Sequence, residues 1–159
     1  MAVQNIDMNN LSLVNYKLKL SYIPNVEYRV QRASLPGMTL TPVAQATPFV
    51  PAWRTGNVSY DELSCTFIVG ENMKDYLEII NWITKLGYPD SLEQYDYQEH
   101  DASLMILNSA KHPVINVRFT DIFPTSISGV DFDTTLQDIQ YATATVNFRF
   151  TRFYYEPVV

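Results

Sequence analysis

The stretch YATATVNFRFTRFYY, residues 141–155, decides the fold class of this chain. Apolar and polar side chains alternate along it, which is the pattern of a β-strand with one buried face. The apolar set consists of Ala142, Ala144, Val146, Phe148 and Phe150. The phase slips near Arg152 and Phe153, where we expect a bulge. A strand longer than the usual range of roughly 3–10 residues suits a sheet shared with a neighbouring chain or a strand that serves two sheets.

The same alternation recurs along the rest of the chain. It predicts further strands at residues 16–22, 26–31, 63–69, 103–107, 114–122 and 127–132. We expect the first two to pair as a hairpin across a turn at Pro24 and Asn25. Cys65 has no second cysteine to pair with, and within its alternating strand it is expected to be a small core residue.

One segment has the helical period instead. Residues 73–86 place apolar side chains at intervals of three and four, and Asn72 can cap the start. The predicted buried stripe consists of Met73, Tyr76, Leu77, Ile80, Ile83 and Leu86, and Trp82, off its centre, should edge the core or meet a neighbour. These elements predict a mainly β protein: a β-sandwich or partly open barrel of about seven strands with one flanking α-helix. The 159 residues fit a single domain spanning 1–159, with residues 1–12 as an N-terminal arm.

Residues 38–59 show neither pattern and form a predicted long loop. A loop beyond about 12–15 residues is uncommon in a compact domain that gives it no function. This one carries large apolar side chains, so it should either fold back on its own domain or dock onto another protein, and we favour docking. The candidate inter-subunit contact residues are Pro48, Phe49, Val50, Pro51, Trp53 and Arg54.

Net charge and the N-terminus narrow the choice of partners. The net charge is −6, with no Lys/Arg block, which makes the chain a poor general binder of nucleic acid. The N-terminus does not resemble a secretory signal, and no apolar run is long enough to cross a membrane. We expect a protein made and folded in a cytoplasm, without a membrane partner.

Residue types that carry catalysis or bind metals give no convergent pattern. His100 and His112 have no partner at metal-ligand spacing and are expected to be loop residues. One acidic group is expected to be a solvated face and not a calcium site: Glu93, Asp96, Glu99 and Asp101. A second group is expected to consist of turn residues and not to form an acid/base pair: Asp131, Asp133 and Asp138. The sequence therefore predicts no catalytic residue, no metal and no cofactor, and a chain that is not an enzyme.

Several short motifs occur in a distinctive order. They are RASLPG at 32–37, YDEL at 60–63 followed by TFIV at 66–69, ENMKDYLEIINW at 71–82, DIFPTSISG at 121–129 and the terminal strand at 142–155. Together they resemble the tail tube proteins of contractile-tailed bacteriophages, a family similar in fold to the haemolysin-coregulated tube protein of type VI secretion. The resemblance spans residues 16–155.

The resemblance implies a structural role. In that family, hexameric rings stack into a tube inside a contractile sheath, and double-stranded DNA passes through the lumen without specific binding. It implies that residues 38–59 reach the adjoining ring, with Phe49 and Trp53 as candidate anchors. The implied partners are further copies of the chain, the tail sheath protein, a baseplate tube initiator and a tail terminator. The implied location is the virion tail, assembled in the host cytoplasm.

Three other functions stay open at this point. The chain could be a baseplate initiator or terminator of the same superfamily, although initiators often carry an additional domain for which 159 residues leave little room. It could be the tube subunit of a secretion or injection particle. From a different class, it could be a non-viral carbohydrate- or ligand-binding β-sandwich that uses exposed Tyr and Trp side chains for stacking.

Overall fold

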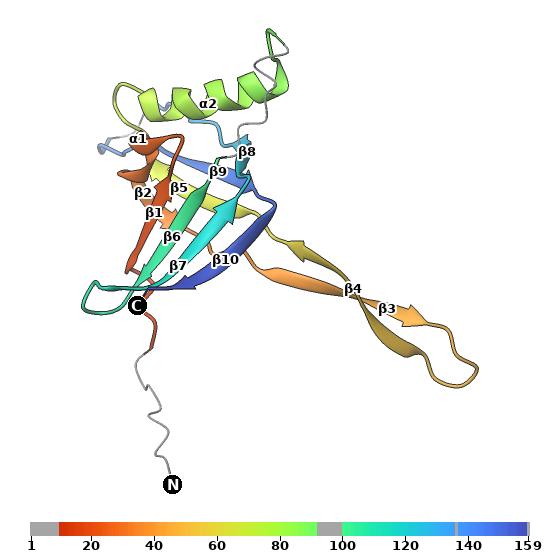
Figure 1. Ribbon diagram of the computed structural model, residues 1–159. Helices are drawn as coiled ribbons and strands as arrows, with labels where there is room; N and C mark the ends of the chain where they lie inside the picture. The colour runs from red at the N-terminus through yellow and green to blue at the C-terminus, as the bar shows by residue number, and fades with distance from the viewer. Residues whose placement is uncertain (1–9, 92–99, 136, 159) are drawn as a thin grey trace.

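The computed structural model describes residues 10–91, 100–135 and 137–158, within which the chain forms ten strands and two helices (Figure 1). The first four-stranded sheet has the order β1 (Tyr16–Leu20), β6 (Ala102–Leu107), β7 (Pro113–Thr120) and β10 (Arg152–Pro157). The second has the order β2 (Val30–Ala33), β5 (Leu63–Ile68), β9 (Thr143–Arg149) and β8 (Phe123–Ile127). Strands β3 (Met38–Gln45) and β4 (Ala52–Tyr60) form a separate two-stranded sheet. Most of the predicted N-terminal arm lies outside the described residues.

One hydrophobic core lies between the two four-stranded sheets. The inward residues of the strands are fully or almost fully buried, as their alternation predicts. They include Leu18, Leu20, Leu63, Cys65, Phe67, Leu104, Val117, Phe119, Ala144, Val146 and Phe148. The mainly β sandwich predicted from the sequence is confirmed, and the predicted core position of Cys65 is confirmed with it.

The stretch at 141–155 serves both sheets. Strand β9 pairs with β5 and β8 in the second sheet, whereas β10 pairs with β7 in the first. Between them Phe150 packs edge-on against Phe119 and Phe153, with ring centroids 5.0 and 5.8 Å apart. The phase slip predicted near Arg152 is therefore the corner where the chain changes sheet, not a bulge within one strand.

Two predicted strands are wrong in part. Within 26–31, residues Pro24–Glu27 form the short helix α1, because proline is well placed in the first helical turn and Val26 is fully buried. Strand β2 then pairs with β5, so the predicted hairpin with residues 16–22 does not form. The strand predicted at 127–132 is wrong except at Ile127, because β8 begins at Phe123 and ends at Ile127. Its Pro124 is tolerated because β8 is an edge strand.

Helix α2 (Lys74–Gly87) forms as predicted but turns a different face to the core. Its buried residues are Asp75, Ile79 and Trp82, whereas Leu77 of the predicted stripe is 49% exposed. The predicted stripe was built on apolar residues alone and did not include Asp75. The Asp75 carboxylate is buried in polar contacts with Gly70 and Arg29. Asn72 contributes at the helix start by accepting a hydrogen bond from the Lys74 amide at 3.3 Å.

Candidate assembly interface

Strands β3 and β4 form a long antiparallel hairpin that projects away from the sandwich (Figure 1). The pairing runs from Met38 opposite Tyr60 to Gln45 opposite Ala52. This replaces the loop predicted at 38–59. Every residue of β3 is exposed, so neither face of the hairpin is selected for burial. Alternation is confined to its root, where Met38 and Leu40 alternate with Thr39 and Thr41 before proline interrupts the pattern.

The root of the hairpin is fixed to the core. Tyr60 packs against the rings of Phe150 and Phe153, with centroids 5.7 and 5.2 Å away. The amide of Asp61 donates to the carbonyl of Gly37 at 3.0 Å, which closes the two strands at their base. A Cβ atom at Gly37 would lie 2.6 Å from the Asp61 carboxylate, so this close approach favours glycine. The hairpin is therefore held rigidly at one end and free at the other.

All six predicted contact residues lie on this hairpin and all are exposed. Residues 48–51 belong to the connection between the strands, where the hydroxyl of Thr47 donates to the carbonyl of Val50. Trp53 and Arg54 lie on β4, opposite Ala44 and Val43. Phe49 is 96% exposed and Trp53 is 67% exposed, which is unusual for aromatic side chains of this size.

Further exposed apolar residues on the hairpin were missed in the sequence. Leu40, Val43 and Val58 are each about half exposed, with 49%, 51% and 48% of their surface accessible. They extend the apolar surface of the hairpin from its tip towards its root. Strand-forming residues with large apolar side chains, interrupted by proline, are the signal that would have indicated an exposed hairpin.

The residues considered for catalysis or metal binding have structural surroundings. His100 stacks near Tyr22 and Trp82, with ring centroids 4.2 and 5.3 Å away, and burial lowers its pKa below the usual 6.5. His112 lies in an exposed turn where its amide donates to the Asn108 side chain. Burial raises the pKa of the Cys65 thiol to about 12, so it is not a nucleophile at neutral pH.

The acidic groups behave mostly as surface and turn residues. Asp101 pairs with Arg118 at 2.6 Å, and Glu93, Asp96 and Glu99 lie outside the described residues. Asp133 accepts hydrogen bonds from the amide and hydroxyl of Thr135, which lowers the pKa of the Asp133 carboxyl. Within the described ranges, no group of three His, Cys, Asp or Glu side chains is arranged to hold a metal ion.

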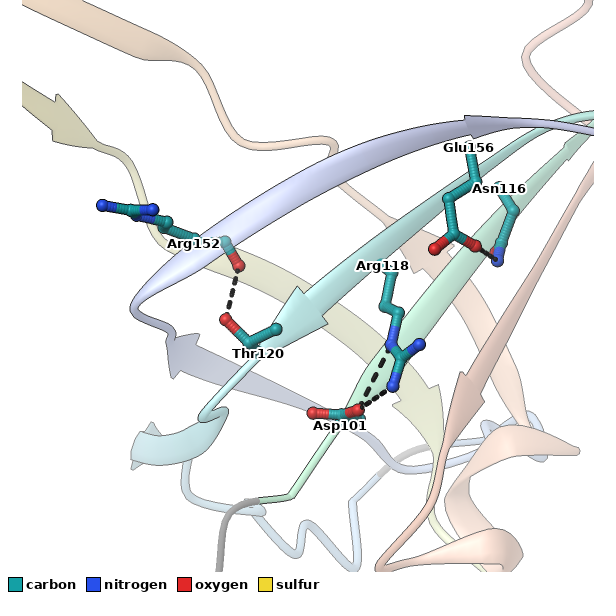
Figure 2. Close-up of polar contacts among 6 residues, drawn as sticks. All are labelled: Asp101, Asn116, Arg118, Thr120, Arg152 and Glu156. Atoms are coloured by element: carbon teal, nitrogen blue, oxygen red, sulfur yellow. Dashed lines mark hydrogen bonds and ion pairs between the residues drawn. The ribbon is translucent and has the colours of Figure 1, made fainter.

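The outer faces of the two large sheets differ. On the first sheet, polar pairs link neighbouring strands: Arg118 with Asp101, Asn116 with Glu156 at 3.3 Å, and the Thr120 hydroxyl with the carbonyl of Arg152 (Figure 2). The second sheet presents mainly small polar side chains. There the hydroxyls of Thr66 and Thr145 lie 3.0 Å apart, and Asn147 donates to the Ser126 hydroxyl at 3.1 Å.

The family follows from the whole length of the chain. The sequence model of the family described as phage tail tube protein matches residues 3–156. The chain belongs to this family. The family and the fold are those of structural tube proteins, in agreement with the expectation of a non-enzymatic chain. No curated protein sequence matches the chain.

Several solved structures have the same fold. A chain of the extended sheath–tube complex of an extracellular contractile injection system, PVC, has a TM-score of 0.72 at 13% identity, covering 96% of this chain and 95% of its own. A chain of the anti-feeding prophage tube-terminating cap has a TM-score of 0.72 at 14% identity, covering 99% and 100%. Hcp1 from Flavobacterium johnsoniae has a TM-score of 0.52 at 12% identity, covering 90% and 95%.

These matches confirm the predicted likeness to tail tube proteins and to the type VI tube protein at the level of the fold. The tail tube fold accounts for the three sheets and for the flanking helix α2. Among the described residues, no helix has both the length and the apolar character needed to cross a membrane.

Proposed function

We propose that this chain is the repeated tube subunit of a contractile bacteriophage tail. Hexameric rings of the chain stack into a tube, and the lumen conducts double-stranded DNA into the host during ejection. The observation that carries this proposal is the β3–β4 hairpin, which exposes Phe49, Val50 and Trp53 beyond the sandwich. Large exposed apolar surfaces of soluble proteins mark sites of protein–protein contact. Membership of the tail tube family makes the next ring the expected partner.

Ring closure uses the sheet edges. The outer strands of the two large sheets are β1 and β10 in the first and β2 and β8 in the second. An unpaired strand edge is a template for pairing with another chain, and a closed ring removes that edge from solvent. Where the rotation between identical copies closes, edge-to-edge pairing gives a ring rather than an open aggregate.

The second sheet is the better candidate to line the lumen. The outer faces of its central strands, β5 and β9, carry Thr66, Thr145 and Asn147, and the charge of Arg149 is paired with Glu62 at 3.0 Å. Edge strand β2 adds Arg32. A wall with few unpaired cations neutralises few DNA phosphates and so releases few counter-ions on contact. DNA therefore passes along it without binding. The first sheet exposes four cations, of which Lys17 and Arg118 are paired with Glu27 and Asp101. Lys19 and Arg152 are left there, against Arg32 on the second sheet, so the first sheet suits an outward position better.

The sheath, the baseplate and the terminator are the proposed further partners, in a virion tail assembled in the host cytoplasm. The structures with the same fold support these partners. They include chains of a sheath–tube complex, a baseplate and a tube-terminating cap. The polar outer face of the first sheet would then contact the sheath.

A second candidate is an initiator or terminator of the tube, in a phage or in an injection particle. It is favoured by the baseplate and cap chains, which have TM-scores of 0.68 and 0.72 with this one. Both candidates place the chain in a ring, and they differ in whether rings repeat. Family membership favours either over a carbohydrate-binding sandwich.

The test is assembly with and without seeds. Purified protein is analysed by sedimentation alone and after addition of phage baseplates. The repeated tube subunit should form polymers whose mass grows with protein concentration, whereas an initiator or terminator should stop at a single ring. A chain that stays monomeric in both conditions contradicts both candidates.

A further inference from the structure

A pocket of about 640 Å³ lies at the end of the second sheet where β5 finishes and β9 begins. Its lining includes Arg29, Ile68, Val69, Val130, Phe132 and Tyr141. Phe132 is 80% exposed and Tyr141 is 78% exposed, although both are aromatic. The apolar surface of the pocket is therefore left uncovered in the isolated chain and is suited to contact with another molecule.

The floor of the pocket is a fixed part of the fold. The amide of Val69 donates to the carbonyl of Ala142 at 2.8 Å, which holds the two sides together. The amide of Gly70 donates to the buried carboxylate of Asp75 at 3.1 Å. A Cβ atom at Gly70 would lie 2.7 Å from the guanidinium of Arg29 and 3.1 Å from the carboxylate of Asp75, so a larger residue would displace these two side chains. The pocket is thus shaped before any partner arrives.

The root of the hairpin and the pocket lie at opposite ends of strand β5 in the second sheet. Strand β5 begins at Leu63, close to the hairpin root at Tyr60, and runs to Ile68 at the pocket. In Figure 1 the hairpin leaves the root in the direction away from the far end of β5. The hairpin therefore cannot enter the pocket of its own chain, and it can reach such a pocket only in another copy. A head-to-tail contact repeats from copy to copy, and it gives a stack where the repeat does not close into a ring.

The charges of the two surfaces are complementary. Arg54 is the only charged side chain in residues 38–60. The pocket side carries Glu71 in its lining, and Asp131 and Asp133 flank Phe132. The pocket lining thus holds one carboxylate, Glu71, and two more lie beside Phe132 in the sequence. The cation in the lining, Arg29, is paired with the buried Asp75, so it does not offset them. Complementary charges of this kind fix the orientation of two partners.

We propose that the hairpin tip of one copy, through Phe49 and Val50, occupies the pocket of the copy in the next ring, with Arg54 facing Asp131 and Asp133. This inference rests on the proposed tube function and adds the receiving site to it. It also gives the acidic residues around Phe132 a role in docking.

Cross-linking between two singly labelled copies tests the contact. One copy carries Phe49→Cys, the other carries Phe132→Cys with a size tag, and a short bismaleimide joins the thiols after mixing. Both positions are exposed, so neither change touches the core. The native Cys65 is buried and does not react. The matched control is Tyr88→Cys, at an aromatic residue that is 83% exposed after α2.

The heterodimer yield with Phe132→Cys should exceed that with Tyr88→Cys by about tenfold or more, which corresponds to about 1.4 kcal/mol of preference. Adding Arg54→Glu to the first copy should remove this excess, and adding Asp131→Lys and Asp133→Lys to the second should restore it. Equal yields for Phe132→Cys and Tyr88→Cys overturn the pocket as the receiving site, even where tubes form. Preferential cross-linking at Phe132 without any tube supports the docking contact and contradicts the tube function.

Discussion

The guanidinium of Arg29 lies 3.4 Å from the carboxylate of Asp75, which is 5% exposed at the start of α2. The same carboxylate accepts the amide of Gly70. These contacts tie α2 to two segments that precede it in the chain: Arg29 lies just before β2, and Gly70 follows β5. Asp75 is the buried charged residue among those described, and its burial is tolerated because both carboxylate contacts are made.

Removal of this carboxylate should destabilise the fold. Asp75→Ala leaves the Gly70 amide buried without an acceptor, which costs about 1–3 kcal/mol. The free energy of unfolding, measured by urea denaturation, should fall by that amount. Glu71→Ala, at an exposed acidic residue nearby, is the control and should change it by less than about 0.5 kcal/mol. Equal effects of the two variants would show that the buried contacts contribute nothing.

Trp53→Ala should separate assembly from folding. The side chain is 67% exposed in the isolated chain, so its loss should change the free energy of unfolding by less than about 0.5 kcal/mol. The same change removes an aromatic anchor from the proposed contact between rings. Sedimentation should therefore show shorter polymers at a given protein concentration. Tyr88→Ala, at an exposed aromatic outside the hairpin, should leave polymer length unchanged, and wild-type polymers from Trp53→Ala would argue against a hairpin contact.

Gly56 tests whether the shape of the hairpin matters. A Cβ atom there would lie 2.5 Å from the carbonyl oxygen of Thr41, next to the register shift between Leu40 and Pro42. Gly56→Ala should distort the hairpin and shorten polymers, with the sandwich still folded by circular dichroism. Gly87→Ala is the control, because no atom lies within 4 Å of the added methyl group. Identical assembly by both variants would mean that the hairpin tolerates distortion.

His100 should make stability depend on pH. Burial against Tyr22 and Trp82 lowers its pKa in the folded state below the usual 6.5. The unfolded chain then binds the proton more tightly than the folded chain. Stability is therefore fully present above pH 6.5 and is lost as the pH falls through the lowered value.

The measurement is urea denaturation at about pH 7.5 and about pH 5.5. His100→Phe keeps an aromatic ring and removes the titrating group, so it should lose less stability on acidification than the wild type. The same loss in both proteins would contradict this assignment.

The sequence was informative where one side of an element is buried. The alternation in 63–69 and 114–122 predicts β5 and β7 because Phe67 and Phe119 must face the core while their neighbours face water. It was uninformative for β3 and β4, since neither face of the hairpin is buried within one chain. The residues of this segment were nevertheless predicted as a contact surface, because exposed apolar side chains need a partner.

Two other errors have local causes. Val26 and Val30 fit an alternating strand, but Pro24 starts a helical turn and the two valines contact different parts of the core. In α2 the buried position Asp75 is charged, and a pattern built on apolar residues alone shifts the predicted face. The pocket could not be predicted, because β5 brings Ile68 beside Val130 and Tyr141 only in the folded sheet.

The central claim is that the hairpin stacks rings of this chain into a tube. The most direct test replaces residues 46–51 by Asn-Gly, a two-residue turn that closes the pairing of Gln45 with Ala52 and removes the tip. Wild-type and shortened proteins are compared by negative-stain electron microscopy over a concentration series, with phage baseplates as seeds. We expect hollow tubes from the wild type and no more than single rings from the shortened chain. Tubes of equal length from both proteins would contradict the claim.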